Sequence, residues 1–225
     1  MENKLLPVVD LIKKSFDAYY KKVWTLAGLM LFGFLGLLAF FPLGLTGLAI
    51  SWGPFSRSDF NAGIILVDIL LGLAGLFAAI FFGLWARVAL FFSIKEQELD
   101  FKNSLSVSWP KMWQFFWVSL LVGLAVLGGF ILFVIPGIIF SVWFCLAMFV
   151  FVAEGLKGTS ALKRSRQLVQ GYWWPVFGRL ALLGILIMLI SSIKFFGPII
   201  NIFFTAPFAV AFEYYLYEDL RRVKG

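Results

Sequence analysis

The sequence contains no histidine and only one cysteine, Cys145, which lies within an apolar run. A disulfide within one chain is therefore excluded, as is a metal site built on histidine or on a cysteine cluster. Charged residues are also scarce, at 14% of the 225 residues, where soluble domains carry about 25%. Hydrophobic residues make up 62%, against about 45–50% in soluble domains. This composition predicts an all-α membrane protein with several spans.

The sequence also lacks the motifs of common catalytic sites. It has neither a GxxxxGK[ST] phosphate loop nor a GxSxG nucleophile elbow. Metal-assisted hydrolysis needs acids and histidines that converge, but Asp68, Glu154 and Glu213 fall in different apolar segments. We therefore expect no enzymatic activity, no metal and no cofactor.

The formal net charge is +7, which would fit either nucleic acid or an anionic membrane surface. The basic residues lie beside hydrophobic segments, where attraction to anionic headgroups explains them, so we expect no nucleic-acid partner. The N-terminal segment is charged and amphipathic, unlike a cleavable signal peptide, and the first span is expected to stay in the mature protein.

Six apolar segments are long enough to be membrane spans in a single domain covering residues 1–225. The first has two readings, because its apolar run continues beyond Pro42 to Ile50, so that it is either long or re-entrant. A polar loop at residues 51–61 follows it. The predicted spans are residues 23–41, 62–94, 114–134, 137–153, 173–193 and 199–217, with a polar tail at residues 218–225.

Three further segments have an apolar face opposite a charged face, at residues 3–22, 103–112 and 159–171. Helices of this kind lie along a membrane surface with their cations toward the headgroups. The predicted headgroup contacts are Lys13, Lys14, Lys21, Lys22, Lys163 and Arg166.

A spacing shared by these segments predicts an internal repeat. In each, a serine precedes by nine residues a tryptophan at or near the start of a span, and the span ends in a turn that contains proline and glycine. Three copies of a surface helix followed by a transmembrane hairpin would account for this order, with units at about residues 3–94, 95–154 and 155–217. The serine and tryptophan pairs are Ser15 and Trp24, Ser108 and Trp117, and Ser165 and Trp174, and the turns contain Pro42 with Gly44, Pro136 with Gly137, and Gly197 with Pro198.

The distribution of cations predicts the topology. With six spans, fifteen of the 19 lysines and arginines fall on the side that holds both termini and all three surface helices. Only Arg57 and Lys194 fall on the other side. The positive-inside rule then makes the termini and the surface helices cytoplasmic, in a plasma or inner membrane.

The segment from Pro136 to Trp174 resembles the membrane domain of glycerophosphoryl diester phosphodiesterases and related uncharacterised bacterial integral-membrane families. In those enzymes the chemistry belongs to a separate soluble domain. Since membrane spans occupy most of the 225 residues here, the activity does not carry over. The likeness is carried by Pro136, Gly137, Glu154, Gly155, Ala161, Leu162, Ser165, Leu168 and Gly171.

Glu154 ends the fourth predicted span, where a partly shielded carboxylate is costly without a cation. Arg87, Arg164 and Arg179 are available on the same side, so an ionic cluster is expected with at least one of them. The alternative is that Glu154 is solvated and each arginine binds lipid phosphate.

Asp68 and Arg87 lie about 28 Å apart along one helix and cannot pair, so each either reaches an interface or marks an internal polar site.

Two classes of function remain open. The first is a non-enzymatic protein that organises anionic lipid or partner proteins, or copies of itself, at the cytoplasmic leaflet. The second is a small transporter or channel for a solute or lipid, which would need polar residues to converge at mid-membrane. Few polar residues lie at that depth, which favours the first class; they are Ser119, Ser141, Ser191, Ser192 and Asn201.

Overall fold

The computed structural model describes residues 5–42, 62–193 and 197–224, and the regular elements in these ranges are all helices. The predicted all-α class is confirmed. The polar loop at residues 51–61, Gly44, Arg57 and Lys194 lie outside the described residues.

The elements are α1 (Val8–Lys21), α2 (Val23–Phe34), the 3₁₀ helix η1 (Leu35–Phe40), α4 (Ala62–Lys95), α5 (Phe101–Ser108), the 3₁₀ turn η3 (Trp109–Lys111), α6 (Met112–Leu132), α7 (Val134–Phe144), α8 (Ala147–Glu154), α9 (Thr159–Val169), α10 (Trp173–Ser191), α11 (Gly197–Ile200), the π-helical turn η4 (Asn201–Thr205) and α12 (Ala206–Lys224).

Several helices are long and apolar enough to cross a membrane, as the sequence predicts for a multi-span protein. Four segments qualify within the described residues: Leu66–Lys95, Phe101–Leu132, Val134–Glu154 and Trp173–Ser191. A fifth span results if α1 and the helix that follows it are counted together, although they are bent by 75°. The sixth predicted span, residues 199–217, is not among them, because α12 carries Glu213 and then the charged run from Glu218 to Lys224.

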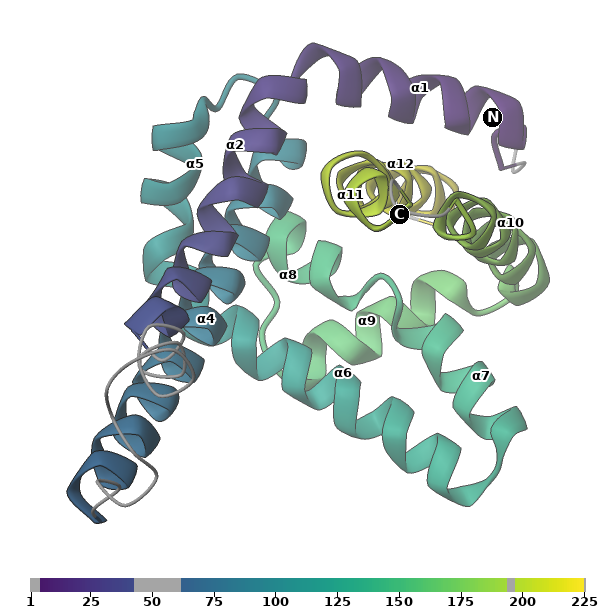
Figure 1. Cartoon of the computed structure of the whole chain (residues 1–225). Coiled ribbons are helices and arrows are strands. Elements are labelled where there is room, and N and C mark those ends of the chain that lie inside the picture. The colour runs from purple at the N-terminus through teal and green to yellow at the C-terminus, as the bar shows by residue number, and fades with distance from the viewer. Residues whose placement is uncertain (1–4, 43–61, 194–196, 225) are drawn as a thin grey trace.

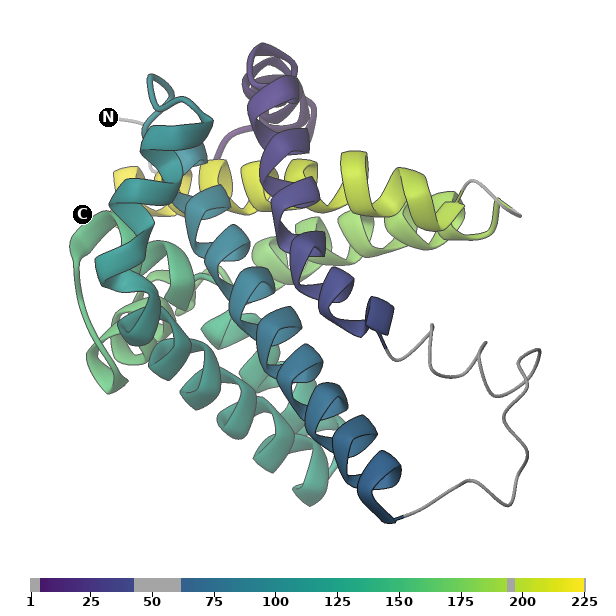
Figure 2. The same ribbon diagram turned by 60° about the vertical axis from the view of Figure 1, so that its left-hand side comes forward.

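Three helical hairpins extend in different directions from one shared end of the molecule (Figures 1 and 2). They are formed by α2 with α4, by α6 with α7, and by α10 with α11 and η4, which continue into α12. Their buried side chains gather toward the shared end, for example Leu26 in α2, Val88 in α4, Val118 in α6 and Val176 in α10, all at most 1% exposed. We call this end, made of α1, α8, α9 and the adjoining ends of the hairpins, the hub.

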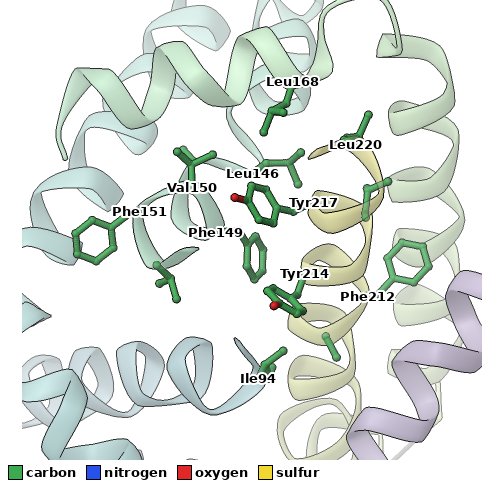
Figure 3. Close-up of a cluster of buried hydrophobic side chains, with 14 of the residues drawn as sticks. Ile94, Leu146, Phe149, Val150, Phe151, Leu168, Phe212, Tyr214, Tyr217 and Leu220 are labelled. Atoms are coloured by element: carbon green, nitrogen blue, oxygen red, sulfur yellow. The ribbon is translucent and has the colours of Figure 1, made fainter. Parts of the chain in front are cut away.

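The hub is organised around α8, whose residues Ala147 and Phe149–Val152 are all buried. A helix that is apolar on every side is stable only inside a protein or a membrane. Phe149 packs between Tyr214 and Tyr217 of α12, with ring centroids 6.0 and 6.4 Å away. Leu168 of α9 and Leu220 of α12 complete this cluster (Figure 3). The core therefore joins the third hairpin to α8 and α9.

The second predicted surface helix, residues 103–112, is not a separate element. α5, η3 and α6 form one continuous helical segment, Phe101–Leu132. Trp109 and Pro110 cause only a 3₁₀ turn, since a proline in the first turn of a helix needs no backbone donor. The correction removes one of three predicted surface helices, whereas α1 and α9 are separate amphipathic helices near the predicted positions.

The predicted tight turn at Pro136 and Gly137 is also corrected. The chain reverses at Phe133, whose backbone is extended, and α7 begins at the next residue. Pro136 and Gly137 therefore lie in the first turn of α7. A Cβ on Gly137 would lie 2.4 Å from the ring of Phe130, so glycine is needed here for the close approach of α7 to α6.

A similar close approach joins η1 to α4 and gives a testable effect. A Cβ on Gly36 would lie 2.4 Å from the Cα of Ala79 and 2.5 Å from the carbonyl oxygen of Ala78. Replacing Gly36 with alanine is therefore expected to destabilise the protein by about 1–3 kcal/mol, because backbone must move. Unfolding in detergent measures the loss. Gly184→Ala is the matched control, since a Cβ there meets nothing within 4 Å and gains up to about 1 kcal/mol of helix propensity. Equal stabilities for the two variants would contradict the close crossing.

Candidate functional site

An ionic cluster joins α8, α9 and α12 at the hub. The Nε of Arg164 lies 3.1 Å from Glu154 Oε2, and the hydroxyl of Tyr217 donates to Glu154 Oε1 at 2.9 Å. Glu154 is the last residue of α8, which ends because Gly155 adopts a left-handed conformation with φ of 71°. The carboxylate thus has partners on two other helices, and its side chain is only 16% exposed.

The other two candidate partners of Glu154 lie elsewhere. Arg87 is exposed on α4 and lines an apolar groove. Arg179 is 7% exposed, and its Nη2 donates to the backbone carbonyl of Leu6. Of the three predicted arginines, the structure therefore brings only Arg164 to Glu154.

A second polar cluster, which the sequence did not predict, holds the chain before α1. Leu6 donates its backbone N–H to Asp219 Oδ2 at 2.8 Å, while its carbonyl accepts from Arg179. Arg222 bonds the other oxygen of Asp219 at 2.7 Å. Asp219 is 3% exposed and Arg179 7%, so a carboxylate and a guanidinium are both buried against the backbone of one residue, Leu6. From the sequence, Glu154 is the only anionic neighbour expected for Arg179, and no spacing identifies Asp219.

A polar groove of about 700 Å³ opens between α1, α9 and α12, beside both clusters. Cations predominate in it, and Arg164 and Arg222 already pair with carboxylates there. Lys14 and Arg221 add positive charge. The groove therefore suits the phosphate of a lipid headgroup or an acidic segment of a partner. Its lining consists of Leu6, Lys14, Arg164, Tyr215, Glu218, Asp219, Arg221 and Arg222.

The helix α9 has the two faces that its sequence predicts. Ala161, Ser165, Leu168 and Val169 are buried, and the hydroxyl of Ser165 donates to the carbonyl of Trp143 in α7 at 2.7 Å. Lys163 and Arg166 are exposed on the other face.

The guanidinium of Arg166 lies 4.3 Å from the centre of the Trp143 ring. This cation–π contact holds the side chain in place while leaving it accessible to a headgroup.

The lysines of the N-terminal segment divide into two groups. Lys13, Lys14 and Lys21 are exposed, opposite the buried Leu11, Ser15 and Tyr19 of α1. These three remain candidates for headgroup contact.

Lys22 points inward instead and is corrected from a headgroup contact to a helix cap. Its ammonium donates to the carbonyls of Ser93, Glu96 and Leu99 at 2.8, 2.9 and 3.1 Å, where α4 ends. Burial lowers the pKa of this ammonium, and the negative charges of Asp100 and Glu96 oppose that shift. Lys224 caps the end of α9 in a similar way, because its ammonium donates to the carbonyls of Gln167 and Gln170.

The structure brings few other polar groups together. Among the described residues, no group of three or more Asp, Glu, Cys or His side chains could hold a metal ion. Of the polar residues at mid-span, Asn201 donates to the hydroxyl of Ser191 at 2.6 Å, whereas Ser141 bonds a carbonyl of its own helix.

Comparison with protein-family models, with curated proteins and with solved structures finds no match to this chain. The resemblance to the membrane domain of glycerophosphoryl diester phosphodiesterases therefore stays an expectation from the sequence, and what can be assigned is a helical protein with four or five candidate membrane spans.

Proposed function

We propose that this chain is a non-enzymatic integral membrane protein that organises anionic lipid or a partner protein at the cytoplasmic leaflet. The observation that carries the proposal is the hub surface. There α1 and α9 are anchored by buried apolar faces while Lys13, Lys14, Lys21, Lys163 and Arg166 stay exposed. Cations that are fixed in position lose less side-chain freedom when they bind headgroups, and each contributes about 1 kcal/mol near an anionic surface.

The finer architecture belongs to the same proposal: six spans, with α11 to α12 as the sixth, arranged as three repeats. The three serines of the repeat, Ser15, Ser108 and Ser165, are all fully buried. The three tryptophans that follow them are exposed, at 88% for Trp24, 47% for Trp117 and 74% for Trp174. Corresponding positions are therefore alike in burial, which supports a common origin for the three units.

The termini also support the proposed topology. The bond from Leu6 to Asp219 ties the chain before α1 to the C-terminal helix. Figure 2 likewise shows the C-terminal part of α12 on the side of the molecule where the described chain begins. An even number of spans requires this arrangement, and the positive-inside rule makes that side cytoplasmic.

An environment-sensitive dye at position 167 tests the role of the hub surface. Gln167 is exposed beside Arg166, and Gln167→Cys in a Cys145→Ala background keeps every cation. In vesicles we expect a blue-shifted emission when phosphatidylglycerol is present, a smaller shift with phosphatidylcholine alone, and reversal by salt, because exposed charges are screened. Lys163→Gln should weaken the response.

A dye at the exposed Trp24 is the matched control, because a tryptophan in that position faces the bilayer in either lipid. An emission at position 167 that is the same in both lipids and insensitive to salt would contradict lipid binding by α9.

A further inference from the structure

An apolar groove of about 500 Å³ lies where the first hairpin meets the third. Met30 and Phe34 of α2 form one wall, Gly83 and Leu90 of α4 another, and Val210 of α12 the third. Its volume is within the range of known ligand sites. α2 contacts η4, which precedes α12 in the third hairpin, and in Figure 2 it crosses that hairpin. Of the helices around the groove, α4 is a candidate span and α2 belongs to the bent pair that would be a fifth.

Among the described residues that line this groove, Arg87 is the only charged one. No hydrogen bond, ion pair or cation–π contact to Arg87 is present among the described residues, whereas Arg164 and Arg222 each pair with a carboxylate. A guanidinium next to hydrocarbon is costly unless an anion meets it. Its planar fork matches a phosphate, which it can bind through two parallel hydrogen bonds.

Arg87 lies at the depth where lipid phosphates are expected. α4 begins at Ala62, and about 20 residues cross the hydrocarbon core, so Arg87 lies beyond the core toward the hub. The burial of α4 changes at the same place. None of its hydrophobic side chains is buried from Leu66 to Trp85, whereas Ala86, Val88, Ala89 and Leu90 are all at most 6% exposed. α4 thus passes from the bilayer into the hub at Arg87.

The floor of the groove leaves room for a chain that runs down from Arg87. Gly83 lies four residues before Arg87, on the same face of the helix. A Cβ on Gly83 would meet no atom within 4 Å, so the space beside it is open. An acyl chain can therefore continue from the guanidinium past Gly83 along apolar walls.

We propose that this groove binds one phospholipid with an anionic headgroup, its phosphate on Arg87 and an acyl chain beside Gly83. The inference rests on the proposed function in requiring a membrane, but it concerns a different site from the basic faces of α1 and α9. Any groove open to the bilayer fills with acyl chains. The lone cation is what makes this one select an anionic lipid over a zwitterionic one.

Co-purified lipid provides the test. The full chain is reconstituted in vesicles of equal parts phosphatidylcholine and phosphatidylglycerol and extracted in mild detergent. Mass spectrometry then measures the ratio of the two lipids that remain bound. We expect the ratio for the wild type to favour phosphatidylglycerol over the vesicle composition, and Arg87→Gln to reduce that preference by about tenfold.

Three further variants make the test specific. Arg87→Lys keeps the charge and should keep most of the preference. Gly83→Leu fills the groove without touching Arg87 and should displace the lipid. Gly123→Leu on α6 is its matched control, because a Cβ at Gly123 also meets nothing within 4 Å, and it should behave as the wild type. Added glycerol phosphate should not displace the lipid, since it lacks the chain.

The inference is overturned if the wild type shows no preference, or if Arg87→Gln keeps it in full. A preference that survives Gly83→Leu overturns the groove as the place of the chain. Should Arg87→Gln fail to fold, the comparison of Gly83→Leu with Gly123→Leu still shows whether the bound lipid occupies the groove. The dye at position 167 reports lipid binding at the hub surface, which is a separate site. If the protein shows no preference for phosphatidylglycerol in the groove but the dye still responds to it, the groove proposal is rejected and the proposed function is not.

Discussion

Replacing Asp219 with asparagine is expected to lower the free energy of unfolding by about 3–5 kcal/mol, the largest loss among the substitutions considered for this protein. Asp219 is 3% exposed and accepts from the backbone of Leu6 and from Arg222. Asparagine keeps one acceptor oxygen but removes the charge. Arg179, which donates a hydrogen bond to the carbonyl of Leu6, is then left buried without a nearby anion.

Reversible unfolding in mixed detergent and denaturant measures the loss. Asp17→Asn is the matched control: it removes the same charge from the exposed face of α1 and should change stability by less than about 0.5 kcal/mol. Adding Arg179→Met to Asp219→Asn should recover part of the loss, because it removes the uncompensated charge. If the losses of unfolding free energy in Asp219→Asn and in Arg179→Met simply add in the double variant, the two groups are not coupled.

Glu154→Gln should produce the second largest loss, about 2–3 kcal/mol. The substitution preserves the shape of the side chain but breaks its ion pair with Arg164 and weakens the bond from Tyr217. Arg164 is 29% exposed, so water can solvate its guanidinium after the substitution, and the loss stays below that at Asp219. Melting in detergent is the measurement.

Tyr217→Phe separates the two contacts of Glu154. It removes only the hydroxyl, so it should cost about 1 kcal/mol, and its effect should shrink when Glu154→Gln is already present. High salt should weaken the Arg164 contribution more than the Tyr217 contribution, because only the first is an ion pair. Strictly additive effects of the two substitutions would argue against a shared cluster.

The positions of α1 and α9 could be predicted because apolar residues that recur every 3.6 positions lie on one face of a helix, and such a face is usually buried. Ala161 and Ser165 of α9 are buried on the face that the sequence assigned to the interior. In α1 the prediction holds only in part, because Tyr19 of the predicted apolar face is buried, whereas Val9, Phe16 and Tyr20 of the same face are exposed. The partner of Glu154 was narrowed to three arginines by side and depth. The sequence could not exclude the other two, because only the packing of the helices places Arg87 beside the apolar groove and Arg179 against the carbonyl of Leu6.

Other features depend on contacts that no local pattern contains. Pro136 and Gly137 read as a turn, but proline is tolerated early in a helix and the glycine serves the crossing with Phe130. Lys22 read as a surface cation because its targets, the last carbonyls of α4, lie more than seventy residues away in the chain. Asp219 gave no signal because its partner on the N-terminal side is a backbone N–H, which every residue but proline possesses.

The two lysine caps have a consequence for the order in which the protein is built. Lys22 is translated before α4, so the first hairpin can complete its own helix end as soon as α4 emerges from the ribosome. Lys224 follows Gln170 by 54 residues, and Asp219 follows Leu6 by 213. The hairpins can therefore insert one after another, while α9 and the segment before α1 must wait, each with unsatisfied backbone groups, until the C-terminal helix has been synthesised.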